Sequence, residues 1–469
     1  METEDTKLLK FNRTNLVKEI SRVVKIDKKF LMHGVTDFIW PRLDFLKGKR
    51  RSENRYFLFE DSYVETEWKD MISIHYINTS YKVQNTVMRV HIFIENEMTD
   101  DAYIGFFTLR KVDETRIMLS FIYPDWKKIE CRFDGRSETV YVMTYKKKVH
   151  IGGKEFSINT YPLFVQDNLT IACAQADIIS MSKYLHNKFD NQMFRVKDLG
   201  VAYATRKTKL FPTSGLNAVQ IIEVFNYCNI PVQYLVIDNK KDVIDENAEL
   251  YREYVDYSIE SGIPVLLGMV ITDKKGKKNK HIVQIIGHTK HNRECYIFYD
   301  DSGYFLRSLK SESNGFVGAI EWKNLYRIIR EEKSYLIYPI HEKVYLSYDE
   351  IKEIFKLECE NRESIKKLKE NELAFPAKTR YLLADNRAVK KFLRNILNND
   401  SLLQKEIDEI NRLLEINMSH YVWYCELPLS QGYFIFLADA TYGRVTTKDI
   451  FYSDAIYSEK QLSLLSYTE

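Results

Sequence analysis

The chain has 469 residues, of which 45% are hydrophobic and 29% are charged, with 17 glycines and 9 prolines. These proportions exclude a largely disordered protein and leave room for two or three domains with cores of their own. The 69 basic and 66 acidic residues give a net charge of +3, which provides no bulk attraction to nucleic acid, so no nucleic-acid partner is expected.

Residues 1–158 predict an N-terminal β-rich module with a leading helix. The helical pattern runs from about Leu16 to Phe30. Aromatic and β-branched runs separated by charged turns follow, and they predict mostly antiparallel strands. These runs are 56–59, 71–77, 87–94, 103–109, 117–123 and 140–144.

Residues 159–342 predict a central region in which helices precede an antiparallel sheet, an α+β organisation. A helix begins at Cys173, with Asn168 or Thr170 as its cap, and a second helix follows Thr213 or Ser214. Strands are expected at 231–237, 263–271, 281–287, 294–299 and 335–339, the last at a sheet edge, with a helix before the second of them.

Residues 343–469 predict a C-terminal region that is helical at first and then returns to strands. Helices are expected near 348–358, 361–371, 387–398 and 402–415, and strands near 421–427 and 433–437. Asp385 and either Asp400 or Ser401 are suitable helix caps.

Cys173 is a candidate nucleophile. A thiol in the first turn of a helix lies among unpaired backbone N–H groups at the positive end of the helix dipole, and both favour thiolate over thiol. A thiolate that attacks a carbonyl also needs a group that handles protons and a donor that stabilises the oxyanion. Gln166, seven residues earlier, is the candidate oxyanion donor. The other five cysteines are expected to be buried small hydrophobes.

His281 is the candidate base, because it opens an apolar strand that forms a hairpin with the strand before it. The next strand ends at Asp300, which could orient the imidazole, and Asp301 could serve instead. His288 and His291 are expected to lie in a polar, solvated turn, and they would replace His281 only if the strand register differed.

The stretch from about Tyr161 to Gly303 resembles the papain-like cysteine peptidases, and most of all their bacterial C39-like branch. In that family a Gln precedes a helix-starting Cys, and a strand-borne His is followed one hairpin later by an Asp. An uncharacterised bacterial group within the branch has the motif Pro-Phe-x-x-Gln-Asp, five residues, Cys-Ala. Here the motif stands as Pro162-Leu-Phe-Val-Gln-Asp167, five residues and then Cys173-Ala174.

Two further segments of that group, an upstream one and a late one, are matched by Tyr103–Arg110 and by Tyr421–Glu426 with Asp439–Thr441. The sequence departs from the wider family in two ways: the Gln lies seven residues before the Cys instead of six, and Ala174 stands where a Gly often follows the nucleophile. The resemblance implies a papain-like core, no cofactor and no metal. It also implies catalytic roles for Cys173, His281, Asp300 and Gln166.

The expected function is hydrolysis of a peptide or other amide bond through an acyl-enzyme on Cys173, with a protein or peptide as the substrate. The same residues would serve a transglutaminase-like acyltransferase or a deamidase, and a catalytically inactive papain-like binding module is the third alternative. The five lysines of 273–280 could attract an acidic substrate or a phosphate backbone, although the solvated tip of a hairpin is the more ordinary reading.

The compartment is expected to be the cytoplasm. The scattered cysteines lack CxxC pairs, which favours a reducing environment over a zinc ribbon or a disulfide framework. The first residues lack a secretion signal, and no apolar run approaches the roughly 18 residues that span a bilayer, so no membrane partner is expected. The sequence predicts no particular oligomeric state.

Overall fold

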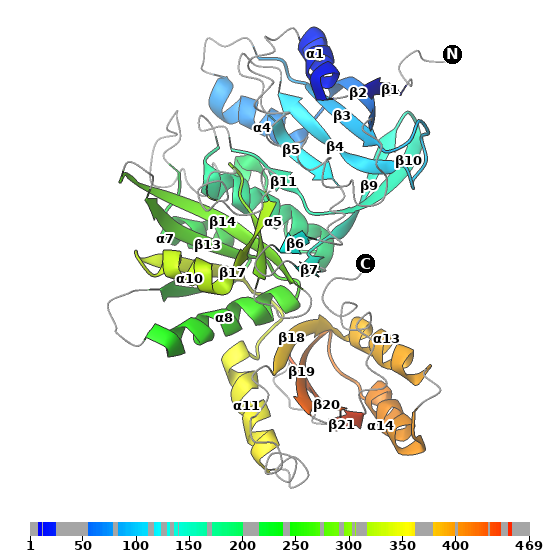
Figure 1. Ribbon diagram of the computed structural model, residues 1–469, viewed down its shortest axis with the longest axis vertical. Coiled ribbons are helices and arrows are strands. Elements are labelled where there is room, and N and C mark those ends of the chain that lie inside the picture. The colour runs from blue at the N-terminus through cyan, green and yellow to red at the C-terminus, as the bar shows by residue number, and fades with distance from the viewer. Residues whose placement is uncertain are drawn as a thin grey trace. The chain divides into compact units, whose positions relative to one another are not determined.

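The computed structural model shows a mixed α+β protein with antiparallel sheets (Figure 1). The chain divides into two compact units. Unit 1 holds residues 1–244 and 264–339, and unit 2 holds 245–263 and 340–468. The structure describes residues 8–11, 13–24, 55–77, 83–110, 117–122, 129–131, 136–138, 140–166, 171–199, 215–237, 244–272, 276–289, 295–302, 305, 317–361, 379–398, 402–429, 432–441 and 449–452.

The two units divide the chain differently from the three expected regions. Strand pairs join segments on either side of residue 158: β11 (Leu163–Phe164) pairs with β5 (Ile117–Ile122), and β8 (Val140–Val142) pairs with β14 (Lys278–Thr289). In addition, the segment 245–263 from the expected central region belongs to unit 2. The division of the chain into these three regions stays a prediction.

The first sheet of unit 1 is antiparallel throughout, as the alternating runs predicted, in the order β1-β2-β3-β4-β5-β11. Three of its inner strands are buried along their whole length, and most of their residues are aromatic or aliphatic. The further elements are β1 (Leu9–Phe11), α1 (Arg13–Val24), β2 (Arg55–Tyr63), β3 (Val87–Phe93) and β4 (Tyr103–Arg110).

The strand predicted at 71–77 is wrong, because this segment is helical. Its β-branched and aromatic residues suit a strand, but tertiary contacts override that preference. The helical turn directly before this segment is held by two ion pairs with buried carboxylates, Glu67 with Lys183 at 2.6 Å and Asp70 with Arg195 at 2.6 Å. The helical elements are α4 (Thr66–Met71) and the π-helix η4 (Ile72–Tyr76).

The second sheet of unit 1 carries the expected hairpin, in which β13 (Val265–Thr272) pairs antiparallel with β14. The strand order is β12-β17-β13-β14-β15-β16, with β8 also on β14. β17 therefore lies inside the sheet, and its expected place at an edge is wrong. The remaining strands are β12 (Val232–Ile237), β15 (Cys295–Tyr299), β16 (Val317–Glu321) and β17 (Ser334–Pro339).

Three helices of unit 1 pack near this sheet: α5 (Cys173–Phe189), α7 (Ala218–Tyr227) and α10 (Trp322–Ile329). The cap of α7 is Asn217, whose side chain accepts the Gln220 N–H at 3.0 Å, whereas the expected caps Thr213 and Ser214 lie outside the described residues. Two separate hairpins complete the unit: β6 (Ile129–Cys131) with β7 (Arg136–Glu138), and β9 (Tyr145–Ile151) with β10 (Lys154–Thr160).

Unit 2 is built on a four-stranded antiparallel sheet in the order β18-β19-β20-β21. The helices expected near 348–358, 387–398 and 402–415 are confirmed. Asp385 caps α13 as expected, because its side chain accepts the Arg387 N–H at 2.6 Å. The expected helix 361–371 and the caps Asp400 and Ser401 lie almost wholly outside the described residues. The elements are α8 (Ile244–Glu260), α11 (Tyr348–Asn361), β18 (Arg380–Asp385), α13 (Asn386–Leu397), α14 (Gln404–Glu415), β19 (Tyr421–Leu429), β20 (Gly432–Asp439) and β21 (Asp449–Tyr452).

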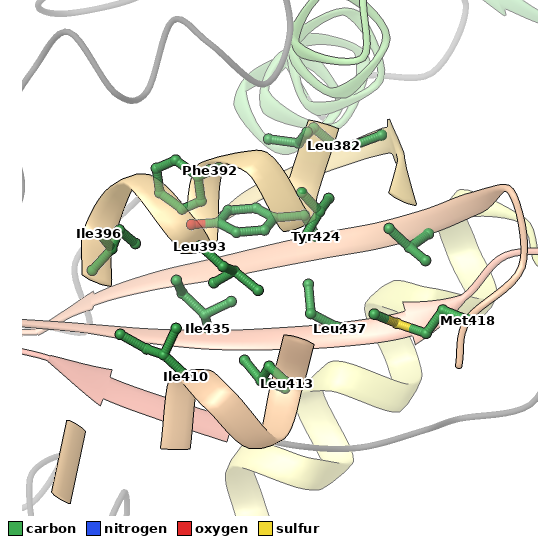
Figure 2. Close-up of a cluster of buried hydrophobic side chains, with 13 residues drawn as sticks. Leu382, Phe392, Leu393, Ile396, Ile410, Leu413, Met418, Tyr424, Ile435 and Leu437 are labelled. Atoms are coloured by element: carbon green, nitrogen blue, oxygen red, sulfur yellow. The ribbon is translucent and has the colours of Figure 1, made fainter. Parts of the chain in front are cut away.

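One face of this sheet is covered by α13 and α14. Figure 2 shows their apolar side chains pointing toward β19 and β20, where alternate residues supply the other half of the core. All of these side chains are buried. The labelled members are Leu382, Phe392, Leu393, Ile396, Ile410, Leu413, Met418, Tyr424, Ile435 and Leu437.

The opposite face packs against α8 and α11 through aromatic side chains. The Tyr257 and Tyr348 rings stack with centroids 4.1 Å apart, and the Tyr257 ring also meets Trp423 of β19 edge-on. A buried ion pair between Arg380 and Glu260 adds a second tie between α8 and β18. These contacts explain why α8 belongs to unit 2 although both of its neighbours in sequence, β12 and β13, lie in unit 1.

Candidate active site

Cys173 is the first residue of α5, as the sequence predicted. The residue before it, Ala172, is the N-cap of the helix, and the Gln175 side chain accepts the Ala172 N–H at 2.7 Å. The expected caps Asn168 and Thr170 lie outside the described residues. Among the cysteines whose side chains the structure describes, Cys173 is half-buried, and Cys228, Cys295, Cys359 and Cys425 are buried.

His281 and Asp300 form a buried hydrogen-bonded pair. β14 and β15 pair with Gln284 opposite Tyr299, which brings the strand end at Asp300 beside His281. The His281 Nε2–H donates to Asp300 Oδ1 at 2.9 Å, and the side chains are 7% and 0% exposed. The same oxygen accepts the Ser302 N–H at 3.2 Å and its hydroxyl at 3.0 Å, so the carboxylate is held in place.

His281 also forms a hydrogen bond with Cys173. Because Nε2 is engaged by Asp300, the ring nitrogen that remains for the sulfur is Nδ1. Burial acts to lower the pKa of His281, but the hydrogen bonds to Asp300 and Cys173 and the negative charges of Asp300 and Asp301 outweigh it and hold that pKa well above its ordinary value. A charged imidazolium is the counter-ion that a thiolate needs.

Of the two adjacent aspartates, Asp300 is the one that hydrogen-bonds the His281 ring. Asp301 is fully buried, and among the residues that the structure describes neither of its carboxylate oxygens has a hydrogen-bond partner. Burial and the nearby charge of Asp177 raise the pKa of Asp301 well above the ordinary range of an aspartate. A carboxyl group in this environment favours its neutral form.

Asp177 is a site neighbour that sequence reasoning missed. It lies one helical turn after Cys173 on α5 and is fully buried. Burial raises the pKa of Asp177 well above its ordinary range, and the charges of Cys173 and Asp300 act in the same direction. The available signal was an acidic residue inside the apolar stripe of a helix, because an aspartate is rarely buried without a functional or structural partner.

Gln166 is half-buried and follows β11 by two residues. The segment is tied to the Cys173 helix, because the Phe164 N–H donates to the Ser180 Oγ of α5 at 2.9 Å. Orientation of the Gln166 amide toward the sulfur stays a prediction.

Two other sequence expectations concern residues beside this site. His288 is buried within β14 and donates from Nδ1 to the Thr289 carbonyl at 2.8 Å, so its expected solvation is wrong. His291 lies outside the described residues. Lys278 is largely exposed and pairs with Glu332, which agrees with the ordinary reading of the lysine run as a solvated hairpin end.

Potential metal ligands coincide with the catalytic candidates. His281, Asp300 and Asp301 each offer a nitrogen or oxygen atom, and these atoms lie within 4.8 Å of one another. Imidazole and carboxylate groups are ligands of zinc and of other transition metals. However, the three donors on Asp300 Oδ1 leave this oxygen committed to the protein's own hydrogen bonds.

The comparisons with known proteins identify no family. No family model matches the chain, and no curated protein matches it. Among solved structures, UfSP from C. elegans aligns with 15% identity and a TM-score of 0.25 over 38% of this chain and 33% of that one. The chain thus matches about a third of that protein's length. In the part of the chain that the structure describes, no helix is both long and apolar enough to cross a membrane.

Proposed function

We propose that the protein is a cysteine hydrolase that cleaves a peptide or other amide bond through an acyl-enzyme on Cys173. The observation that carries the proposal is the bridging position of His281, which hydrogen-bonds both Asp300 and Cys173. In this arrangement the thiol would be the nucleophile, the imidazole its base, and the carboxylate the group that orients the base.

In the proposed reaction, the Cys173 thiolate attacks the substrate carbonyl carbon and the C–N bond breaks as His281 gives its proton to the leaving amine. Water then attacks the thioester, His281 takes the proton of that water, and the carboxylic acid leaves with the thiolate restored. The Cys173 N–H belongs to the first helical turn, where backbone donors have no intrahelical acceptor, and it would stabilise the oxyanion together with the Gln166 amide.

A papain-like core of the C39-like branch is the more specific form of this proposal. It is supported by the motif Pro162–Asp167 with Cys173-Ala174 and by the chain order of Cys173, His281 and Asp300. The helix-starting cysteine and the hairpin strand that carries the histidine agree with that layout. A peptide or protein substrate is part of the same proposal.

The test uses p-nitrophenyl acetate, a small activated ester that any exposed acyl-accepting thiolate can attack. We expect a burst of p-nitrophenolate close to one equivalent per chain and an acetyl adduct on Cys173 in peptide mass spectrometry. Cys173→Ala should abolish both. Gln166→Ala should slow turnover about a hundredfold to a thousandfold. Absence of a burst, with acetylation confined to surface lysines, would refute the proposal.

A further inference from the structure

Three buried side chains outside the proposed triad form one continuous hydrogen-bonded chain. The Tyr161 hydroxyl donates to Gln284 Oε1, and Gln284 Nε2 donates to Asp177 Oδ1 at 2.8 Å. Gln284 and Asp177 are fully buried, and Tyr161 is 3% exposed. The Gln284 amide therefore uses its carbonyl for one neighbour and its NH₂ group for the other.

Each member of this chain lies close in sequence to a proposed catalytic residue. Asp177 follows Cys173 by one turn of α5, Gln284 follows His281 by three residues on β14, and Tyr161 precedes Gln166 by five. Asp177 and Gln284 are 107 residues apart in the sequence. The Gln284 amide thus joins the three segments that carry the nucleophile, the base and the oxyanion donor.

A second pair of buried hydrogen bonds holds the segment that carries Asp300, the fourth proposed catalytic residue. Tyr299, directly before Asp300, donates its hydroxyl to the Phe164 carbonyl, and the Phe164 N–H donates to Ser180 of α5. This tie connects β15, β11 and α5, whereas the Gln284 amide connects α5 with β14. The two ties contact different atoms and can be altered separately.

Directional bonds of this kind have a specific use at a catalytic site. Apolar packing is non-directional, whereas a hydrogen bond restricts both distance and angle. A misplacement of reacting groups by about 1 Å costs about a hundredfold in rate. In addition, a shift of α5 along β14 would break the hydrogen bonds of the buried Gln284 amide. The amide would then incur its full desolvation penalty, and this cost opposes the shift.

We propose that Gln284 is a positioning residue that sets the distance between the Cys173 sulfur and the His281 ring. It acts by holding Asp177 of α5 against β14, and its bond to Tyr161 extends the constraint to the Gln166 segment. This inference rests on the proposed cysteine chemistry. The neutral form that burial favours at Asp177 is compatible with the role, because an uncharged carboxyl adds no repulsion to a nearby thiolate.

The test measures the rate of Cys173 alkylation by iodoacetamide from pH 5 to pH 9, quantified on the Cys173 peptide by mass spectrometry. Gln284→Leu keeps the side-chain volume and removes both bonds. Gln284→Asn keeps the amide and shortens its reach by about 1.5 Å. We expect both variants to lower the rate at pH 6–7 about tenfold to a hundredfold. Asp177→Asn keeps an acceptor for Gln284 Nε2 and should stay within about threefold of the wild type.

Thr108→Val is the matched control. It removes a buried hydroxyl that bonds Leu119 between β4 and β5, and a buried hydrogen bond of either kind contributes about 1 kcal/mol to stability. Urea unfolding measures the loss for each variant. We expect Thr108→Val to lose stability and keep the wild-type alkylation profile.

A Gln284 variant that loses stability but keeps the wild-type profile would overturn the positioning role, and so would an Asp177→Asn profile as impaired as that of Gln284→Leu. If Gln284→Leu fails to fold, the alkylation profile of Gln284→Asn serves as the test of the positioning role. Failure of the proposed function itself is distinguished by His281→Ala. If this variant alkylates Cys173 at the wild-type rate, the cysteine chemistry is absent whatever Gln284 does.

Discussion

Replacement of Asp300 by asparagine isolates the charge that the imidazole contacts. The asparagine carbonyl oxygen can still accept the hydrogen bonds from His281 and Ser302, so the shape and the acceptor remain while the negative charge is lost. Asp300 is fully buried, and solvent therefore cannot replace its charge. The substitution should weaken the imidazolium, and with it the thiolate–imidazolium pair, more than it weakens the fold.

The magnitude follows from the kind of bond that is altered. A hydrogen bond to a charged group contributes about 1.5–3 kcal/mol and one to a neutral acceptor about 0.5–1.5 kcal/mol, so the substitution should lose the difference of about 1–1.5 kcal/mol. Because about 1.4 kcal/mol corresponds to a factor of ten, the ratio of the thiolate–imidazolium pair to the neutral thiol–imidazole pair should fall about fivefold to tenfold. This ratio does not depend on pH, because both forms hold the same number of protons.

Iodoacetamide alkylation of Cys173 reports this ratio between pH 6 and pH 7. Between pH 6 and pH 7, the alkylation rate of Asp300→Asn should fall by up to the factor expected for that ratio. Near pH 10 the rate should approach that of the wild type, because hydroxide removes the thiol proton without help from His281. The control is Asp100→Asn, which neutralises a carboxylate that accepts the Ser157 N–H in an exposed position. An equal fall at every pH, or no fall at all, would refute the role of the Asp300 charge.

Three further predictions concern buried groups. Burial raises the pKa of Asp301 in the folded state, so the protonated carboxyl stabilises the fold fully below about pH 4, and this stabilisation is lost as the pH rises through the folded-state pKa. Asp301→Asn should therefore raise the unfolding free energy measured with urea at pH 8 and leave it unchanged at pH 4. An equal effect at both pH values would contradict this. Glu260→Ala should cost about 3–5 kcal/mol in unfolding free energy by leaving Arg380 buried and uncompensated, and a second change of Arg380 to alanine should recover part of the loss, whereas a further full loss would argue against the ion pair. Gly287→Ala should cost about 1–3 kcal/mol, because its Cβ would lie 2.0 Å from the Tyr141 carbonyl oxygen of β8, and an unchanged urea midpoint would contradict the close approach.

The sequence alone determined the local placement of the site. A polar stretch followed by residues at helical spacing located the start of α5 at Cys173, and the apolar runs before and after the lysines located the β13–β14 hairpin with His281 in its second strand. Asp300 followed from the end of the next strand. These are short-range signals, because helix starts, hairpins and strand ends depend on residues that are neighbours in the chain.

The tertiary structure alone decided which of these residues meet. The choice of Asp300 over Asp301, the burial of Asp177 beside Cys173 and the Gln284 link depend on segments about 20 to 120 residues apart. The same holds for the helical conformation of 71–77, which directly follows the helical turn whose carboxylates Glu67 and Asp70 bind Lys183 and Arg195, and for the place of α8 in unit 2. Periodicity shows that a residue will be buried, but the partner that it meets is set by packing between distant segments, and a local pattern contains no information about that partner.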